Sequence, residues 1–258
     1  MKRALLIGIN GYPGQPLNGC VNDITDMADQ LVSGHGFATA DIRLLTDARA
    51  TADAIRERIT WLIADAKPDD TLLLHYSGHG TLFPIRDAAG NVTEVHGAIC
   101  PVDFDWTEPH AIFDSELRQL IDRAPTDAEF IFVSDSCHSG KLTRRFRPRV
   151  FLPPEDIAWR LRTALEKGIT PQTLETHDRC GFISGCREDQ TSADAYFDGR
   201  YNGALTYFLL ESLKAGEGTL PLTTLVENVR NRLSQAAYDQ EPQLHGPDTV
   251  VNRGFLAH

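Results

Sequence analysis

The sequence of 258 residues lacks the features that mark membrane, secreted and nucleic-acid-binding proteins. Its apolar runs fall well short of the roughly 18 to 20 residues of a membrane-spanning helix, and residues 4–9 are too few for the core of a signal peptide. Five cysteines do not amount to a disulfide framework, because an odd number leaves at least one thiol unpaired. The 25 basic and 36 acidic residues leave a net charge of −11, which disfavours nucleic acid as a partner. We therefore expect a protein of the reducing cytoplasm with neither a membrane nor a nucleic-acid partner.

The residues that are present describe an ordinary globular α/β chain. Residues 4–9, 71–76 and 129–134 are apolar without alternation, as in strands buried on both faces of a parallel sheet. Between these runs, apolar positions recur at helical spacing and predict helices, which we place at 20–32, 51–66 and 114–121. Strands that alternate with helices indicate right-handed crossovers. We expect a mostly parallel central sheet of about six strands with helices on both faces.

The second half of the chain changes character before order resumes. Residues 141–179 combine a basic stretch with several prolines, and we interpret them as a linker or insert. Elsewhere along the chain we expect strands at 41–45, 180–185 and 242–245, a hairpin within 92–101, and helices at 203–214 and 222–234. We expect a single domain over residues 1–258, with 1–140 as its larger part and 180–258 as its smaller part.

Polar residues begin where two of the buried strands end. His79 lies in a Ser-Gly-His-Gly turn after the strand at 71–76, and Cys137 lies in a similar turn after the strand at 129–134. The carboxyl ends of parallel strands meet at one edge of a sheet, so both side chains are expected to face one cleft. A thiol with a neighbouring base is a nucleophile, and the backbone N–H groups of Gly80 and Cys137 are placed to stabilise an oxyanion. The pattern predicts acyl transfer.

Other interpretations of these residues remain open at this point. A single cysteine is commonly a small buried apolar residue, and a single histidine is commonly a hydrogen-bonded structural residue. His75, His79 and His138 together with cysteines would permit a metal site, although the chain contains no C-x-x-C pair. The stretch ending at Lys141 is not a phosphate-binding loop, because Asp135 stands where that motif needs glycine. No G-x-S-x-G elbow supports a serine nucleophile.

The two motifs resemble those of the caspase-like clan of cysteine peptidases, and most closely the metacaspases, including the bacterial forms called orthocaspases. The histidine motif reads His-Tyr-Ser-Gly-His-Gly-Thr at 75–81, and Asp-Ser-Cys-His-Ser-Gly follows at 135–140, with Cys137 placed 58 residues after His79. Five further segments also resemble metacaspase stretches, at 18–23, 43–47, 101–103, 190–194 and 240–244. The resemblance spans nearly the whole chain.

The resemblance implies a caspase-hemoglobinase fold and a thiol protease, a hydrolase of peptide bonds. Under it, Cys137 is the nucleophile, His79 the general base or acid, and the Gly80 and Cys137 amides the oxyanion hole. It also implies cleavage after Arg or Lys, with the pocket for that side chain formed by Cys20, Asp23, Ser77 and Asp135. Carboxylates suit a guanidinium that leaves water. Without the resemblance, Asp23 and Asp135 would be read as acids that cap a helix and a turn.

The sequence departs from the calcium-activated members of the family. Positions that carry acids in those members hold His96, Asp114 with Ser115, and Arg144 here. Calcium prefers six to eight oxygen ligands, which histidine and arginine do not supply. We expect no required cofactor and no metal site, and activity without calcium. A relocated calcium site at Asp87, Asp103 and Asp105 is the alternative.

Two further expectations concern processing and partners. Five of the nine residues at 141–149 are basic, so this segment offers bonds for self-cleavage within 141–179, or else it is a solvated basic loop. We expect a monomer that acts on proteins or peptides with basic residues at the cleavage site. The alternatives are a catalytically silent caspase-like scaffold that binds basic segments, and a relative that cleaves after another residue.

Overall fold

The core of the molecule is a six-stranded sheet. This computed structural model describes residues 1–138, 147–174, 179–187 and 190–257. The strand order is β12-β9-β7-β3-β1-β2, with bounds β1 (Lys2–Gly8), β2 (Ile42–Thr46), β3 (Thr71–Ser77), β7 (Glu129–Asp135), β9 (Gly181–Ser184) and β12 (Gln243–His245). All neighbours in this sheet are parallel except β12, which runs antiparallel to β9. The predicted α/β fold with a mainly parallel sheet of six strands is confirmed.

Alternate residues of the central strands feed two separate cores. On β3, Leu72 and Leu74 join one apolar cluster, whereas Leu73 between them joins the other. β7 behaves in the same way, with Phe132 on one side and Ile131 on the other. Side chains of a strand alternate between the two faces of a sheet, so a strand covered on both faces must be apolar throughout. This explains the uninterrupted apolar runs of the sequence.

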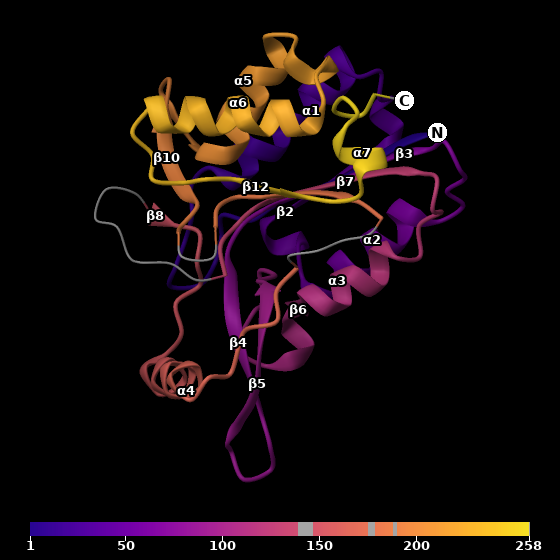
Figure 1. Cartoon of the computed structure of the whole chain (residues 1–258). Helices are drawn as coiled ribbons and strands as arrows, with labels where there is room; N and C mark the ends of the chain where they lie inside the picture. Colours follow the sequence, from indigo (N-terminus) through magenta and orange to yellow (C-terminus); the bar gives the residue numbers. More distant parts are fainter. Residues whose placement is uncertain (139–146, 175–178, 188–189, 258) are drawn as a thin grey trace.

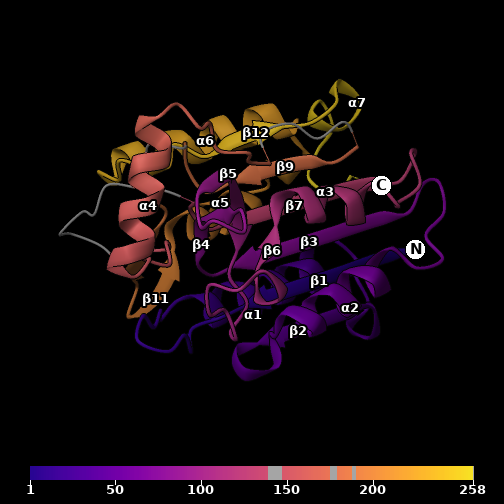
Figure 2. The same ribbon diagram turned by 90° about the horizontal axis from the view of Figure 1, so that it is seen from below.

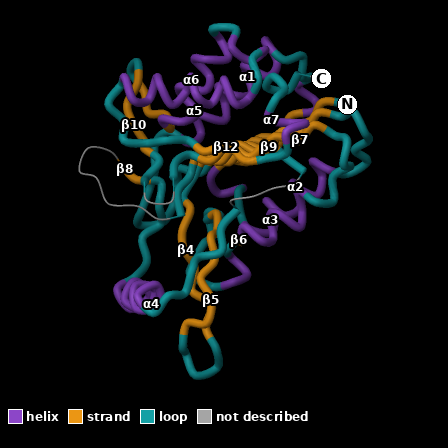
Figure 3. Tube along the Cα trace, viewed as in Figure 1, coloured by secondary structure: helices purple, strands orange, loops and turns teal. Residues whose placement is uncertain are grey.

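Helices cover both faces of the sheet (Figure 1). One face is covered by α1 (Cys20–Gly34), α5 (Ala204–Lys214) and α6 (Leu222–Gln235), and the other by α2 (Ala52–Ile63) and α3 (Asp114–Ile121). Figure 3 shows the sheet edge-on between these two groups of helices. The short α7 (Asp248–Val251) follows β12. Among the described residues, no helix combines the length and the apolar character needed to cross a membrane.

The prediction of a hairpin within 92–101 was wrong in its extent. The hairpin instead joins β4 (Gly80–Arg86) to β5 (Val92–Ile99), and β5 also pairs with the short β6 (Ile112–Phe113). Asp87 forms the turn, because its carboxylate accepts hydrogen bonds from the N–H groups of Ala89 and Asn91, both within 2.9 Å. The sequence analysis did not predict β4, since Pro84 within it argues against a strand. Proline is tolerated there because β4 is an edge strand.

The segment expected as a linker contains regular structure in its described part. β8 (Arg147–Pro148) pairs with β10 (Ala193–Phe197), which pairs in turn with β11 (Arg200–Gly203), a hairpin that the sequence analysis did not anticipate. α4 (Glu155–Glu166) follows β8 and lies beside the β4–β5 hairpin, away from the central sheet (Figure 2). Pro154 stands at the N-cap of α4, so this proline starts a helix rather than marking a loop.

Candidate active site

His79 and Cys137 lie at the same edge of the central sheet. His79 follows β3 and Cys137 follows β7, and these two strands are neighbours in which Ser77 pairs with Asp135. Both side chains are buried, with 3% of His79 and 2% of Cys137 exposed. The register of two adjacent parallel strands therefore brings together residues that are far apart in the sequence.

Two tyrosines hold the backbone of His79. The Tyr12 hydroxyl accepts a hydrogen bond from the His79 N–H at 3.1 Å, and the Tyr76 hydroxyl donates to the His79 carbonyl at 2.6 Å. The Nε2 atom of His79 lies 2.8 Å from the carbonyl oxygen of Gln15. A carbonyl only accepts, so the neutral ring carries its proton on Nε2 and keeps Nδ1 as the basic nitrogen. Nδ1 is buried and makes no hydrogen bond of standard geometry with the described residues, but the Arg149 backbone is near enough to the ring to raise its pKa.

Burial keeps both groups of the pair uncharged. Desolvation lowers the pKa of His79 to about 4, so the imidazole is neutral at physiological pH. Desolvation also raises the pKa of Cys137, and the neighbouring thiol of Cys186, with Sγ atoms 2.9 Å apart, raises it further. The Ser192 N–H also donates to the Cys137 sulfur. The pair is a thiol with a neutral imidazole, so a nucleophilic attack by this thiol would require transfer of its proton.

The backbone N–H groups of Gly80 and Cys137 converge on one peptide carbonyl, that of Arg149. The Gly80 nitrogen lies 3.1 Å and the Cys137 nitrogen 3.2 Å from the Arg149 oxygen. Glycine at position 80 is required by this close approach, because a Cβ atom there would lie 2.6 Å from the carbonyl oxygen of Cys137. The two amides expected to form an oxyanion hole thus bind the carbonyl of a residue of the same chain.

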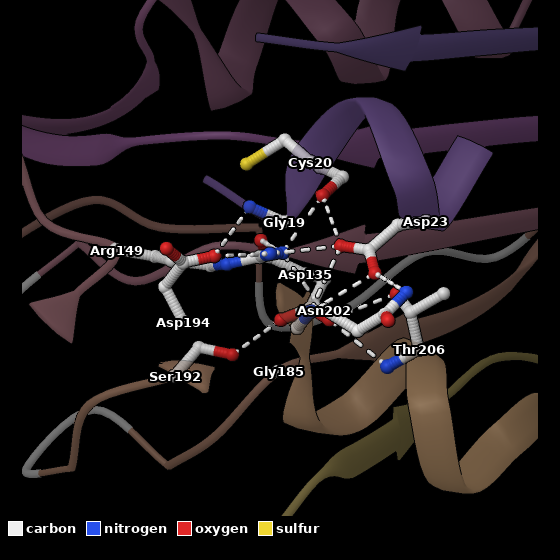
Figure 4. Close-up of polar contacts among 12 residues, drawn as sticks. Gly19, Cys20, Asp23, Asp135, Arg149, Gly185, Ser192, Asp194, Asn202 and Thr206 are labelled. Carbon is white, nitrogen blue, oxygen red and sulfur yellow. Dashed lines mark hydrogen bonds and ion pairs between the residues drawn. The ribbon is translucent and has the colours of Figure 1, made fainter. Parts of the chain in front are cut away.

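The side chain of Arg149 fills a buried acidic pocket (Figure 4). One terminal nitrogen lies 2.8 Å from Asp23 and 3.2 Å from Asp194. The other donates to the Ser77 hydroxyl at 2.7 Å and lies 3.3 Å from Asp135. The guanidinium fork suits several carboxylates at once. Asp23, Ser77 and Asp135, which the sequence analysis assigned to this pocket, do surround one basic side chain.

The carboxylates are themselves held in place by donors from several elements. Asp135 accepts from the N–H and the hydroxyl of Thr206 at 2.9 and 2.8 Å, at the start of α5. Asp23 accepts from the Gly203 N–H at 2.9 Å. Asp194 accepts from the N–H groups of Asn18 and Gly19, both at 2.9 Å. These bonds compensate part of the cost of burying three acids beside one cation.

Cys20, the fourth expected pocket residue, lies at the first turn of α1 beside the pocket (Figure 4). Its thiol is fully buried. Burial raises its pKa far above the ordinary value, and the nearby Asp194 and Asp23 oppose the lowering effect of Arg149. Cys20 is therefore a protonated part of the pocket wall.

The sequence analysis missed Asp194 and did not place Arg149 inside the pocket. Asp194 belongs to a segment that resembled metacaspases, which was a usable signal, but no role had been assigned to it. Arg149 was noted only as one of several basic residues. No sequence signal pointed to Gln15, whose carbonyl faces His79. Among the described residues, no three or more His, Cys, Asp or Glu side chains are arranged so that they could hold a metal ion.

A thiol and an imidazole at adjacent strand ends, with two amides on one peptide carbonyl, define the class of a cysteine peptidase. The family model for the caspase domain matches residues 1–250. Metacaspase-1 of Scheffersomyces stipitis is 31% identical over 94% of this chain and 70% of its own length. Metacaspase-9 of Arabidopsis thaliana is 27% identical over 99% and 97% of the two chains. A crystal structure of a protein from Geobacter sulfurreducens superposes with a TM-score of 0.71 at 26% identity, covering 98% and 96% of the two chains.

The chain belongs to the caspase-domain family and is a metacaspase-like cysteine peptidase.

The acidic pocket makes a prediction about stability. In a Cys137→Ala background, Arg149→Met should lower the free energy of unfolding at pH 7.5 by about 3 to 5 kcal/mol, because three buried carboxylates lose their cation. Burial raises the pKa of Asp23 to about 6 although Arg149 lowers it, so loss of this cation raises it further in the folded variant. The folded variant then binds a proton that the unfolded chain does not, and the deficit should shrink as the pH falls. Urea denaturation at pH 7.5 and pH 5.5 measures both effects.

The matched control is Arg147→Met in the same background. Arg147 is exposed, and its side chain reaches only the Pro16 carbonyl, at 3.2 Å, among the contacts of the described residues. Its replacement should change stability by less than about 0.5 kcal/mol. Equal losses in the two variants would show that the pocket does not depend on the Arg149 charge.

Proposed function

We propose that this protein is an endopeptidase that hydrolyses peptide bonds after Arg or Lys. The proposal depends on one observation, which is that Arg149 lies in the site as a substrate residue would. Its guanidinium occupies the acidic pocket while its carbonyl accepts hydrogen bonds from the Gly80 and Cys137 amides. The position of this one residue explains how a basic side chain would be recognised. It also explains how the peptide bond after that residue would be polarised.

The proposed reaction uses the two neutral groups of the site. The Cys137 sulfur attacks the carbonyl carbon while Nδ1 of His79 takes the thiol proton. The Gly80 and Cys137 amides stabilise the negative oxygen that forms. His79 then gives its proton to the departing amine, which leaves an acyl-enzyme on Cys137. Water, deprotonated by His79, hydrolyses this thioester and restores the thiol.

The charge of the pocket supports a basic residue before the cleaved bond. Three carboxylates, those of Asp23, Asp135 and Asp194, surround the bound guanidinium. An acidic substrate residue there would add a like charge to a buried site, at a cost of several kcal/mol. The pocket therefore disfavours the Asp preference of animal caspases. A silent scaffold that binds basic segments would also fill this pocket, and only turnover separates the two functions.

A panel of fluorogenic peptides tests the activity. Peptides that end in Arg or Lys before the reporter should be hydrolysed, and matched peptides that end in Asp or Asn should react at least about a hundredfold more slowly, because they leave buried carboxylates unpaired. Alkylation of Cys137 should abolish turnover. Binding of the Arg peptide without any turnover would favour the scaffold, and faster cleavage of the Asp or Asn peptide would reject the proposed specificity.

We further propose that the chain cleaves itself between Arg149 and Val150, within the segment 141–179 in which the sequence analysis expected self-processing. The support is again the position of Arg149. Lys141, Arg144 and Arg145, the other basic residues that precede Arg147 in the segment, lie outside the described residues.

Intact mass measures self-cleavage directly. On incubation the wild type should give fragments 1–149 and 150–258, whereas Cys137→Ala should stay intact because it lacks the nucleophile. Arg147→Met retains Arg149 and should still be cut at the same bond. Identical intact chains for the wild type and Cys137→Ala would remove the proposal, and cleavage after another residue would correct its position.

We propose that activity does not require calcium. Of the positions that carry acids in calcium-activated relatives, Asp114 accepts from the Leu174 N–H at 3.0 Å and lies 3.3 Å from Nε2 of His138. The Nε2 atom of His96 lies 2.8 Å from a carboxylate oxygen of Glu94. Arg144 lies outside the described residues. A carboxylate already bound to a backbone amide and beside an imidazole is a poor calcium ligand, and its neighbours supply few oxygens.

The carboxylates of the alternative calcium site, Asp87, Asp103 and Asp105, are also held by hydrogen bonds within the chain. Asp103 accepts from the Ala52 N–H at 3.0 Å, and Asp105 accepts from the Thr107 N–H at 3.0 Å and lies 3.0 Å from His110. Asp87 forms the β4–β5 turn. We expect the same turnover of an Arg peptide in excess chelator as in millimolar calcium, measured as initial rates. Loss of turnover in chelator that calcium restores would defeat this proposal.

The remaining proposals concern setting and assembly. We propose that the peptidase acts as a monomer in the cytoplasm on proteins or peptides, without a nucleic-acid or membrane partner. All five cysteines are free, and a reducing compartment would keep Cys137 in the thiol form that the reaction needs. The net charge of −11 supports basic peptide segments over nucleic acid.

A further inference from the structure

The residues that follow Arg149 lie in the site as an extended strand. Gly80 pairs with Val150 as a parallel bridge, and the Phe151 N–H donates to the Gly80 carbonyl at 2.8 Å. The Thr81 hydroxyl donates to the Phe151 carbonyl at 3.0 Å. These bonds involve only the main chain of the strand, so any extended peptide could form them. They continue directly from the bonds that hold the Arg149 carbonyl.

Gln15 holds the same strand one residue further on. Its side-chain amide accepts from the Leu152 N–H at 2.8 Å and donates to the Leu152 carbonyl at 3.0 Å, as a neighbouring strand would. Its own main-chain carbonyl faces Nε2 of His79. One residue therefore contacts both the strand after the proposed cleavage site and the imidazole. Leu152 is 40% exposed, so the site contacts the main chain of this residue and does not enclose its side chain.

Phe151 is the side chain that the site does enclose. Only 8% of it is exposed, and four rings surround it. The ring centres lie 5.2 Å away for Phe104, 5.6 Å for His79, 5.9 Å for Tyr12 and 6.3 Å for Trp106. Phe104 and His79 meet it edge-on, a favourable arrangement for aromatic pairs. We name these four residues the aromatic box.

We propose that the aromatic box is a substrate subsite that selects an aromatic side chain at the second residue after the cleaved bond, with Gln15 binding the main chain of the third. The inference rests on the proposed function, because it takes Arg149 and Val150 as the two sides of the cleaved bond. Its ligand is an extended peptide of the pattern Arg, any residue, aromatic. In the uncut chain the occupant is the protein's own Phe151.

A role in the apolar core alone would not explain the main-chain hydrogen bonds on both sides of Phe151. A core phenylalanine needs apolar neighbours, but it does not need main-chain bonds to Gly80 and Gln15 on both sides of it. One wall of the box is His79 itself, so an occupant packs against the proposed base. Tyr12, another wall, also holds the His79 backbone through its hydroxyl. Filling the box therefore contacts the groups that orient the imidazole.

Internally quenched peptides that differ only at the second residue after Arg test the subsite. With Arg-Val-Phe, Arg-Val-Leu and Arg-Val-Ala sequences of equal length, kcat/KM should be about tenfold or more higher for Phe than for Ala, because burial of the ring removes a large apolar area from water. Equal values for Phe and Ala would overturn the subsite while leaving the proposed function intact. No cleavage of any Arg peptide would overturn the proposed function, and the subsite with it.

Self-cleavage supplies a second, independent measurement. Phe151→Ala should slow the appearance of fragments 1–149 and 150–258 by about tenfold. The matched control is Trp159→Ala, an exposed aromatic on α4 outside the box, which should leave the rate unchanged. Thermal unfolding of both variants in the Cys137→Ala background checks that each is folded. Self-cleavage of Phe151→Ala at the wild-type rate would overturn the subsite, and if this variant does not fold the peptide series decides.

Discussion

One buried cation and three buried carboxylates hold the site together. The guanidinium of Arg149 is fully enclosed with Asp23, Asp135 and Asp194, each from a different element of the chain. Burying such charges is costly unless every partner is present, since the loss of one leaves another uncompensated. The cluster therefore fixes α1, β7 and β10 relative to one another. It also connects the part of the chain before residue 139 with the part after residue 179.

The position of the Arg149 side chain also determines the position of its main chain. With the guanidinium held, the carbonyl falls on the amides of Gly80 and Cys137, and the next two residues run beside β4. The guanidinium in the acidic pocket, the carbonyl bound by the two amides and the ring inside the aromatic box thus belong to one extended segment, residues 149–151. A peptide bound in the proposed way would have to displace this segment.

The proposed catalytic pair is placed by the sheet rather than by contacts of its own. Adjacent parallel strands bring His79 and Cys137 to one edge, and burial keeps the imidazole and the thiol neutral. The Gln15 carbonyl directs the proton of the neutral His79 ring to Nε2, which leaves Nδ1 as the nitrogen that would accept a proton in the proposed reaction. A neutral pair costs less to bury than an ion pair, which suits a site closed by its own chain.

The amino-acid sequence alone determined the parallel sheet and the two polar turns, because continuous apolar runs and residues at strand ends are local patterns. Asp23, Ser77 and Asp135 were assigned to the pocket only through the resemblance to metacaspase segments, at 18–23, 75–81 and 135–140. The hairpin of β4 with β5, the helix α4 within a proline-rich segment, and the positions of Asp194, Gln15 and Phe151 were decided only by the tertiary structure. Asp194, Gln15 and Phe151 contact partners distant in the chain, and contact at a distance leaves no periodicity or spacing in the sequence. The hairpin and α4 are local, but Pro84 and Pro154 are residues that a sequence-based interpretation takes as signs of a loop. Arg149 shows the difference best: its charge is visible in the sequence, but its burial exists only where three separate carboxylates converge.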